Sequence, residues 1–252
     1  MNYAIVGFGR MGQAVDEQAS GRGHRRSVVV DPAGQGEDRL PEIEASALRD
    51  VHVAFEFSLP GSAERNVLAL AQAGVPVVCG TTGWRPSAAA ERAMRESGTG
   101  IVLAPNFSVG MNLFYRLVRE AARLYGAAGL HQPFVLEAHH RGKRDVPSGT
   151  ARQLASILVE TDPRLNAVHE GNPPEPLPDD TLHVASVRAG SEPGSHTVGY
   201  DGEYDRITLS HGARSRAGFA LGAVLAAEWI ADRPGLHGFD EVLETLLASV
   251  PR

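Results

Sequence analysis

The sequence contains very little lysine and very little cysteine. Of its 24 basic residues one is a lysine, Lys143, and the rest are arginines. One cysteine, Cys79, excludes an internal disulfide and a metal site built from several thiolates, which is typical of a protein of the reducing cytoplasm. No apolar run reaches the roughly 18 to 20 residues of a membrane-spanning helix, and no basic, cleavable leader precedes the first strand-like run. We therefore expect a cytoplasmic protein without a membrane partner.

The chain also lacks an excess of positive charge. It has 30 acidic and 24 basic residues and a formal net charge of −6, so no nucleic-acid partner is expected. A hydrophobic fraction of 42% with 21% charged residues excludes a disordered chain. The length of 252 residues fits one large or two small domains.

Short Val-rich runs alternate with helical segments in the first hundred residues. Because these runs are apolar throughout and bounded by glycine or proline, they predict buried parallel strands. They span residues 3–6, 27–31, 51–57, 75–79 and 100–104, with helical spacing at 61–73 and 86–97 between them. This pattern predicts an α/β fold, a doubly wound parallel sheet of the Rossmann type.

The pattern changes after Pro105. A long amphipathic helix at 109–126 is followed by longer, partly alternating strands, as in an open mixed sheet with one exposed face. These strands span 132–140, 182–189, 196–200 and 205–211; a helix starts near Ser148, and helices return at 219–230 and 240–248. We expect a dinucleotide-binding domain at 1–108 with 217–252, and a second α+β domain at 109–216 for substrate binding and oligomerisation.

The first predicted strand leads into a glycine loop, GFGRMG at 7–12. Gly7 permits a tight turn, Gly9 lets the backbone approach a pyrophosphate, and Gly12 allows close packing of the following helix. The second strand ends in Asp31, about 20 residues beyond the loop, where an acidic side chain binds the ribose of NAD. Asp31 favours NADH, while Arg10 in the loop could meet the extra phosphate of NADPH.

Two further loops follow predicted parallel strands, where open α/β sheets bind ligands. GTTG at 80–83 and APNF at 104–107 offer small residues and an amide that suit a nicotinamide ring. Either tetrapeptide could also be a plain turn.

The densest cluster of chemically active side chains is EAHHRGKRDVPSGT at 137–150. Five potentially cationic side chains, from two histidines, two arginines and the lysine, precede Ser148, which is a good N-cap. The N–H groups of Gly149 and Thr150 would then form an anion site at a helix N-terminus. The cluster predicts a pocket for a small dianion with proton donors beside it.

The position of the one lysine indicates that this basic loop has a function and is not merely a charged surface loop. Arginine supplies charge elsewhere in this chain but cannot release a proton near neutrality. A retained Lys143 indicates a need for a titratable ammonium or for its compact geometry. Glu137 and His139 could instead ligate a metal, but nearby cations would repel it and no third ligand has an evident spacing, so no metal is predicted.

Several of these segments together resemble the dihydrodipicolinate reductase family, enzymes that reduce 4-hydroxy-tetrahydrodipicolinate with NADH or NADPH in lysine and diaminopimelate synthesis. The resemblance rests on GFGRMG at 7–12, GTTG at 80–83, APNFSVGMN at 104–112, EAHHRGKRDVPSGTA at 137–151 and VRAG at 187–190. Many relatives carry Asp-Phe-Thr where this chain has Glu56-Phe57-Ser58. The resemblance also implies a homotetramer formed through the sheet of the second domain.

The resemblance implies a role for each matched residue. His139 would be the catalytic acid/base and Lys143 a proton donor. Substrate contacts would come from His140, Arg141, Ser148, Gly149 and Thr150. Cofactor contacts would come from Gly7, Phe8, Gly9, Arg10, Met11, Gly12, Asp31, Gly80, Thr81, Thr82, Ala104, Pro105, Asn106 and Phe107.

Two other functions are compatible with a dinucleotide-binding domain. One is a protein that senses NAD(P) without turnover, and the other is a different amino-acid-type dehydrogenase. The acid/base set argues against the sensor, and the pairing of HHxxK with PSGT argues against the other dehydrogenase.

Overall fold

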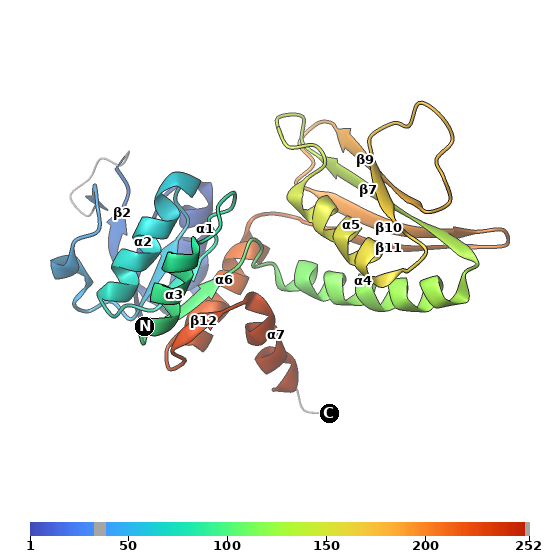
Figure 1. The fold of residues 1–252 in the computed structure, drawn as a ribbon. Coiled ribbons are helices and arrows are strands. Elements are labelled where there is room, and N and C mark those ends of the chain that lie inside the picture. Colours follow the sequence, from blue (N-terminus) through green and yellow to red (C-terminus); the bar gives the residue numbers. More distant parts are fainter. Residues whose placement is uncertain (33–38, 250–252) are drawn as a thin grey trace. The chain divides into compact units, whose positions relative to one another are not determined.

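The computed structural model describes residues 1–32 and 39–249 and divides the chain into two compact units (Figure 1). Unit 1 comprises Met1–Val109 and Arg216–Arg252, and unit 2 comprises Gly110–Ser215. Each unit has its own sheet and its own core. No helix within the described residues is both long enough and apolar enough to cross a membrane.

Unit 1 is built on a seven-stranded parallel sheet of order β12-β6-β5-β4-β1-β2-β3. Its strands are β1 (Asn2–Val6), β2 (Arg25–Val30), β3 (Arg39–Leu40), β4 (Val53–Glu56), β5 (Val77–Cys79), β6 (Gly100–Leu103) and β12 (Gly235–His237). Its helices are α1 (Arg10–Gly21), α2 (Pro60–Gln72), α3 (Ala88–Glu96), α6 (Ala217–Ile230) and α7 (Phe239–Ala248), with a 3-10 turn η1 (Ala45–Leu48). The predicted doubly wound parallel sheet is confirmed.

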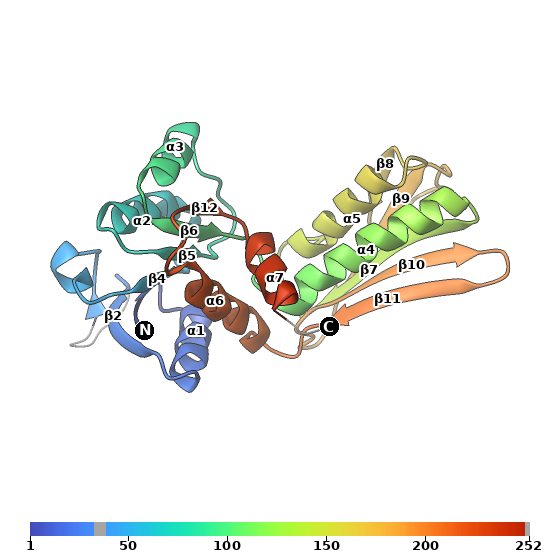
Figure 2. The same ribbon diagram turned by 90° about the horizontal axis from the view of Figure 1, so that it is seen from below.

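Both faces of this sheet are buried, which explains its continuous apolar strands. Figure 2 shows α2 and α3 on one side of the sheet and α1 and α6 on the other. The core beneath α1, α6 and α7 includes Val15, Ala223 and Val242, whereas the core beneath α2 and α3 includes Leu70 and Met94. A strand covered on both faces needs apolar residues at successive positions, so β4 is buried along its whole length.

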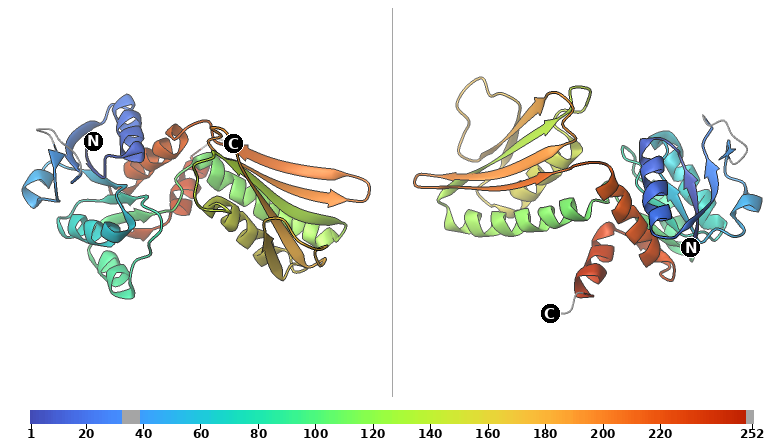
Figure 3. Two further views of the ribbon diagram at one scale, coloured as in Figure 1. Left: turned by 90° about the horizontal axis from the view of Figure 1, so that it is seen from above. Right: turned by 180° about the vertical axis from the view of Figure 1, so that it is seen from behind.

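Unit 2 is a five-stranded mixed sheet of order β11-β10-β7-β9-β8, covered on one face by two helices. The strands are β7 (His131–His139), β8 (Ala167–Glu170), β9 (Thr181–Arg188), β10 (Ser195–Gly202) and β11 (Arg206–Gly212), and the helices are α4 (Val109–Ala128) and α5 (Gly149–Thr161). Figure 3 shows β10 and β11 as a long hairpin at one edge of the sheet. Val135 and Val184 are buried, but Leu136 and Val187, on the opposite face, are exposed. The predicted open mixed sheet with one uncovered face is confirmed.

Four short elements were not predicted: β3, η1, β8 and β12. Each has only two to four residues, too few to show an apolar period. Three of them are edge strands, held by hydrogen bonds to one neighbouring strand. A pairing of this kind is set by the tertiary fold and leaves little trace in the local sequence.

Candidate active site

The glycine loop joins β1 to α1 as predicted. Gly7 has φ +88°, and a Cβ there would lie 2.5 Å from the carbonyl oxygen of Phe57. A Cβ on Gly12 would lie 2.2 Å from the carbonyl oxygen of Gly7, so this glycine brings α1 close to the loop. A Cβ on Gly9 would meet no described atom within 4 Å. The loop therefore has two glycines required by packing and one beside open space, where a phosphate could approach the backbone. 

Asp31 follows the end of β2 and contacts this loop directly. Its Oδ2 accepts a hydrogen bond of 2.7 Å from the backbone N–H of Phe8. The guanidinium of Arg39 lies 4.9 Å from the centre of the Phe8 ring, and that of Arg26 lies 5.4 Å from it. Two arginines therefore lie against the ring of Phe8, whose backbone N–H binds the expected ribose-binding carboxylate. The sequence pointed only to Arg10, because the pairing of β2 with β3 that brings Arg39 here leaves no local pattern.

Phe57 contacts the two remaining predicted cofactor loops and also borders the glycine loop. A Cβ on Gly80 would lie 2.2 Å from the Phe57 ring, so only glycine leaves room for that ring. The rings of Phe57 and Phe107 are 6.2 Å apart, and the Phe57 carbonyl borders Gly7. In the sequence, Phe57 stands out only as part of a departure from the family pattern. The fold makes it the common neighbour of three predicted loops.

The other predicted cofactor residues lie on the same loops with different exposure. Thr81 Oγ1 is buried and has no hydrogen-bond partner in the part of the chain that is described, while its carbonyl accepts from Trp84. Asn106 Oδ1 accepts a hydrogen bond of 2.9 Å from the backbone N–H of Ser108. Arg10, Thr82 and Pro105 are exposed, Met11 is half-buried and Ala104 is buried. An unpartnered hydroxyl and an open glycine fit a polar ligand such as a dinucleotide.

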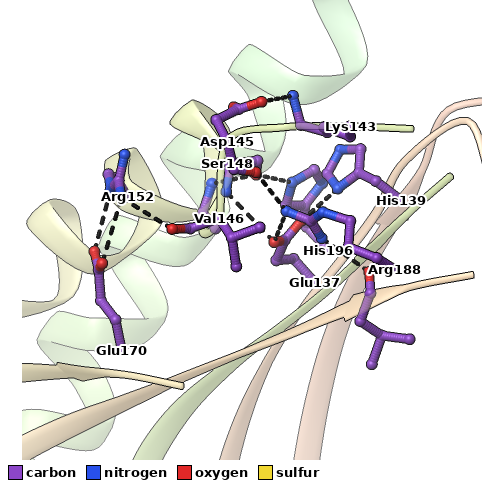
Figure 4. Close-up of polar contacts among 12 residues, drawn as sticks. Glu137, His139, Lys143, Asp145, Val146, Ser148, Arg152, Glu170, Arg188 and His196 are labelled. Atoms are coloured by element: carbon purple, nitrogen blue, oxygen red, sulfur yellow. Dashed lines mark hydrogen bonds and ion pairs between the residues drawn. The ribbon is translucent and has the colours of Figure 1, made fainter. Parts of the chain in front are cut away.

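A buried hydrogen-bonded network occupies the end of β7 in unit 2 (Figure 4). Glu137 is fully buried and His139 is 8% exposed, because alternate residues of β7 face the helices. A short hydrogen bond joins His139 Nδ1 to Glu137 Oε2. Glu137 Oε1 accepts from Arg188 Nη2 at 2.7 Å and, more weakly, from the backbone N–H of Ser148 at 3.4 Å.

Arg188 and His196 are site residues that sequence reasoning missed. Strand pairing brings them in, because β9 places Arg188 opposite His139 and β10 places His196 opposite Glu137. The rings of His139 and His196 are 5.1 Å apart, and His196 Nε2 lies 3.1 Å from Ser148 Oγ. Arg188 stands in the quoted VRAG motif but had been given no role. No local pattern marks His196.

Burial and charge set the protonation states of this network. Burial raises the pKa of Glu137, but the hydrogen bond from Arg188 and the nearby positive charges outweigh it, so the pKa lies below its usual range. Burial lowers the pKa of His139, and the carboxylate of Glu137 offsets only part of this effect. Burial also lowers the pKa of His196 to about 4, so His196 is neutral at pH 7.

Lys143 lies in the loop between β7 and α5. Its Nζ forms a 2.8 Å ion pair with Asp145, and its backbone N–H donates to the carbonyl of His140. Burial raises the pKa of Asp145, but the bond from Lys143 outweighs it and the pKa falls below its usual value. Asp145 was not among the predicted site residues. His140 is half-buried and the side chain of Arg141 is exposed.

The predicted helix N-terminus follows this loop. Ser148 is the N-cap of α5, and its Oγ accepts a hydrogen bond of 3.2 Å from the backbone N–H of Ala151. Gly149 and Thr150 form the first turn, where backbone N–H groups have no acceptor within the helix. This turn can bind a carboxylate. The sequence thus predicted the cap correctly.

The same network is also the candidate metal site. Ligand atoms of Glu137, His139 and His196 lie within 4.8 Å of one another, so the fold supplies a third candidate ligand that spacing did not indicate. However, the oxygens of Glu137 already accept hydrogen bonds from His139 and Arg188, and the guanidinium would repel a divalent ion. The donor set is better suited to proton transfer than to metal binding.

Comparison with known protein families matches both units. The model of the N-terminal part of dihydrodipicolinate reductase matches residues 1–107, and the model of its C-terminal part matches residues 110–243. Among curated proteins, the chain is 35% identical to a 4-hydroxy-tetrahydrodipicolinate reductase of Christiangramia forsetii, over 98% of this chain and 99% of the relative. It is also 35% identical to one of Archaeoglobus fulgidus, over 97% and 100%.

Solved structures show the same fold. A dipicolinate-bound dihydrodipicolinate reductase from Paenisporosarcina superposes with a TM-score of 0.76 at 21% identity, covering 94% of this chain and 97% of that one. An engineered D-amino acid dehydrogenase bound to NADP+ has a TM-score of 0.55 at 16% identity, covering 100% and 99%.

Proposed function

The chain belongs to the dihydrodipicolinate reductase family, and we propose that it reduces 4-hydroxy-tetrahydrodipicolinate to tetrahydrodipicolinate with a nicotinamide cofactor. This reaction serves lysine and diaminopimelate synthesis. The observation that carries the proposal is the group at the end of β7, where the buried His139–Glu137 pair, Lys143 and the capped N-terminus of α5 follow one another within 15 residues of chain, 137–151.

The substrate would bind through its two carboxylates. The N–H groups of Gly149 and Thr150 supply one anion site at the positive end of the α5 dipole. His140 and Arg141, in the preceding loop, supply positive charge for the second carboxylate. Binding the dianion adds negative charge near His139, which favours its protonated form and prepares it as an acid.

A nicotinamide cofactor, when bound, would supply a hydride for the substrate ring. Once the hydroxyl has left, the ring is a conjugated imine, and addition at the carbon remote from nitrogen places negative charge on that nitrogen. Cations of the loop stabilise this charge, and His139 or Lys143 donates the proton that completes the reduction. We assign the acid role first to His139, because it is the one held by a buried carboxylate.

The cofactor would bind on unit 1. Its pyrophosphate would lie against Gly9 and the N-terminus of α1, its ribose against Asp31, and its nicotinamide against the loops at 80–82 and 104–107. Asp31 favours NADH. Arg39 beside Phe8 can pair with a 2′-phosphate, so we propose that NADPH is also used.

An Arg39→Gln variant tests this cofactor assignment. Its KM for NADPH should rise several-fold while its KM for NADH stays near the wild-type value. Equal changes for both cofactors would contradict a role of Arg39 at the 2′-phosphate.

A turnover assay tests the function itself. The aldol product that precedes this step is mixed with NADH or NADPH, and the absorbance of the reduced nicotinamide is followed. We expect enzyme-dependent loss of absorbance with the ring substrate, and no rise in absorbance with an open-chain amino acid and NAD+. A sensor would bind the cofactor without consuming it, and a different amino-acid dehydrogenase would show the opposite substrate preference.

The assembly and location are also proposals. We propose a homotetramer in the cytoplasm, assembled through the uncovered face of the unit 2 sheet. The support is that Leu136 and Val187 are 41% and 46% exposed on that face. Light scattering of the purified protein tests the tetramer, and Leu136→Glu should reduce the measured mass.

A further inference from the structure

Glu137 is placed to control which nitrogen of His139 carries the proton. We infer that Glu137 is a positioning residue that holds the proton of neutral His139 on Nδ1, which leaves Nε2 to exchange a proton with the substrate. The position of the proton on Nδ1 concerns the free protein, whereas the role of Nε2 toward the substrate rests on the proposed function. The carboxylate touches His139 and not the reacting atoms, so it acts through the imidazole.

An ionised carboxylate accepts hydrogen bonds and cannot donate them. Because Glu137 Oε2 lies against His139 Nδ1, the hydrogen between them belongs to Nδ1 when the carboxylate is ionised. Arg188 keeps it ionised, since its Nη2 donates to Glu137 Oε1 at 2.7 Å. Arg188 is itself held, because Nη2 also donates to the carbonyl of Asp145 at 2.7 Å and Nη1 to that of Val187 at 2.8 Å.

Gly194 packs closely against the Nε2 edge of the His139 ring. A Cβ on Gly194 would lie 2.8 Å from His139 Nε2 and 3.0 Å from Cδ2, so any side chain there would displace the ring. His196 packs against the same ring at an interplanar angle of 73° and is neutral at pH 7. The ring is thus hydrogen-bonded to an anion at Nδ1, while Gly194 and His196 pack against it without adding charge.

The charged and titratable groups around His139 come from every neighbouring element. Glu137 stands on β7, Arg188 on β9 and His196 on β10, while Lys143 and Asp145 belong to the following loop. Arg188 and Lys143 disfavour protonation of His139, and Glu137 favours it. A Glu137→Gln substitution therefore removes the negative charge that is hydrogen-bonded to the ring and leaves both cations.

Glutamine would also reverse the tautomer. Arg188 can donate only to the amide oxygen, so the amide NH₂ turns toward His139 and requires Nδ1 to accept. The proton of neutral His139 would then move to Nε2. This change of tautomer distinguishes positioning from a merely structural role.

Nitrogen NMR of ¹⁵N-histidine-labelled protein without substrate measures the tautomer. His139→Asn identifies the His139 resonances among those of the 10 histidines. We expect Nδ1–H in the wild type and Nε2–H in Glu137→Gln. The control is Glu170→Gln, which removes another arginine-paired carboxylate of the same sheet and should leave the His139 spectrum unchanged.

Kinetics provide the second measurement. In Glu137→Gln, kcat should fall on the order of 10²-fold to 10⁴-fold, as when the carboxylate partner of a catalytic histidine is neutralised. The KM for the substrate should change by less than about threefold, and the pH profile should shift toward acid.

The tautomer assignment and the proposed function can be contradicted independently of each other. A wild-type spectrum with Nε2–H would overturn the inference, even if Glu137→Gln cannot be purified in folded form. Retention of Nδ1–H in a folded Glu137→Gln would overturn it as well. If the wild type shows Nδ1–H but does not reduce the substrate, the proposed function is wrong and the assignment of Glu137 stands.

Discussion

At the scale of single residues, Lys143 is unusual in the composition of the chain and also forms a specific ion pair. It is the one lysine of the chain, and its ammonium pairs with the carboxylate of Asp145 at 2.8 Å. An arginine could form this pair but could not donate a proton near neutrality. The contact alone therefore does not explain why lysine is retained.

A Lys143→Arg variant tests this requirement. We expect kcat to fall by about 10²-fold or more, the range of a lost general acid, while the KM for the substrate rises less than about threefold because the charge persists. Steady-state assays measure both. Arg119→Lys, at an exposed and distant ion pair with Glu160, should match the wild type. Full turnover by Lys143→Arg would show that no titratable ammonium is needed.

Gly194 is a second residue whose size matters. Its φ of +141° disfavours a side chain, and a Cβ would contact His139 Nε2. Gly194→Ala should reduce the free energy of unfolding by about 1–3 kcal/mol and kcat by more than about tenfold. Urea titration and steady-state assays measure the two effects. Gly212→Ala on β11, where a Cβ would meet no described atom within 4 Å, should leave both unchanged.

At the scale of elements, two helices begin with the same cap but in different settings. Ser87 caps α3 by accepting from Ala90, and Ser148 caps α5 by accepting from Ala151, both at 3.2 Å. Only Ser148 also contacts a buried histidine, His196. The cap itself should contribute equally to both helices, whereas α5 alone has a role in substrate binding.

Replacing each cap by alanine separates stability from binding. Ser87→Ala and Ser148→Ala should each cost about 1 kcal/mol in the free energy of unfolding, because each leaves a helix N–H without its acceptor. Only Ser148→Ala should raise the KM for the substrate, by several-fold, while the KM for the cofactor stays unchanged. An equal effect of both variants on substrate KM would argue against the α5 N-terminus as a carboxylate site.

At the scale of the whole molecule, the buried histidines of unit 2 make stability depend on pH. The pKa of His196 is about 4 in the folded protein against 6.5 for a free histidine. Only the unfolded chain then binds a proton between these values. Stability is therefore fully present above pH 6.5 and is lost as pH falls toward 4, by about 3 kcal/mol. His139 acts with the same sign, because its pKa is also lowered.

Urea unfolding followed by circular dichroism at pH 7 and pH 4.5 measures this loss. A His196→Asn variant should be less stable than the wild type at pH 7, yet should lose less stability on acidification. A wild type equally stable at both pH values would contradict a buried neutral His196. Below pH 4.5, protonation of Glu137, whose pKa is lowered, should destabilise unit 2 further.

Much of this protein could be predicted because its signals are local. The apolar runs that became β1, β4 and β6, the turn at Gly7, and the cap at Ser148 each depend on neighbouring residues. Short edge strands such as β8 and β12 depend on a partner strand and were missed. Whether His139 and Lys143 act as predicted stays a prediction, since geometry alone does not show turnover.

The sequence by itself determined the two kinds of sheet, the glycine loop and the order of chemical groups along 137–151, because the periods of strands and helices and the preferences of turns are properties of short segments. Only the tertiary structure decided what surrounds His139. Arg188 and His196 come from strands 49 and 57 positions further along the chain, and their registers with β7 follow from packing of whole strands. The same packing brought Arg39 to Phe8 and Phe57 to Gly80. Side chains far apart in sequence meet only when sheets form, so no local pattern could have named them.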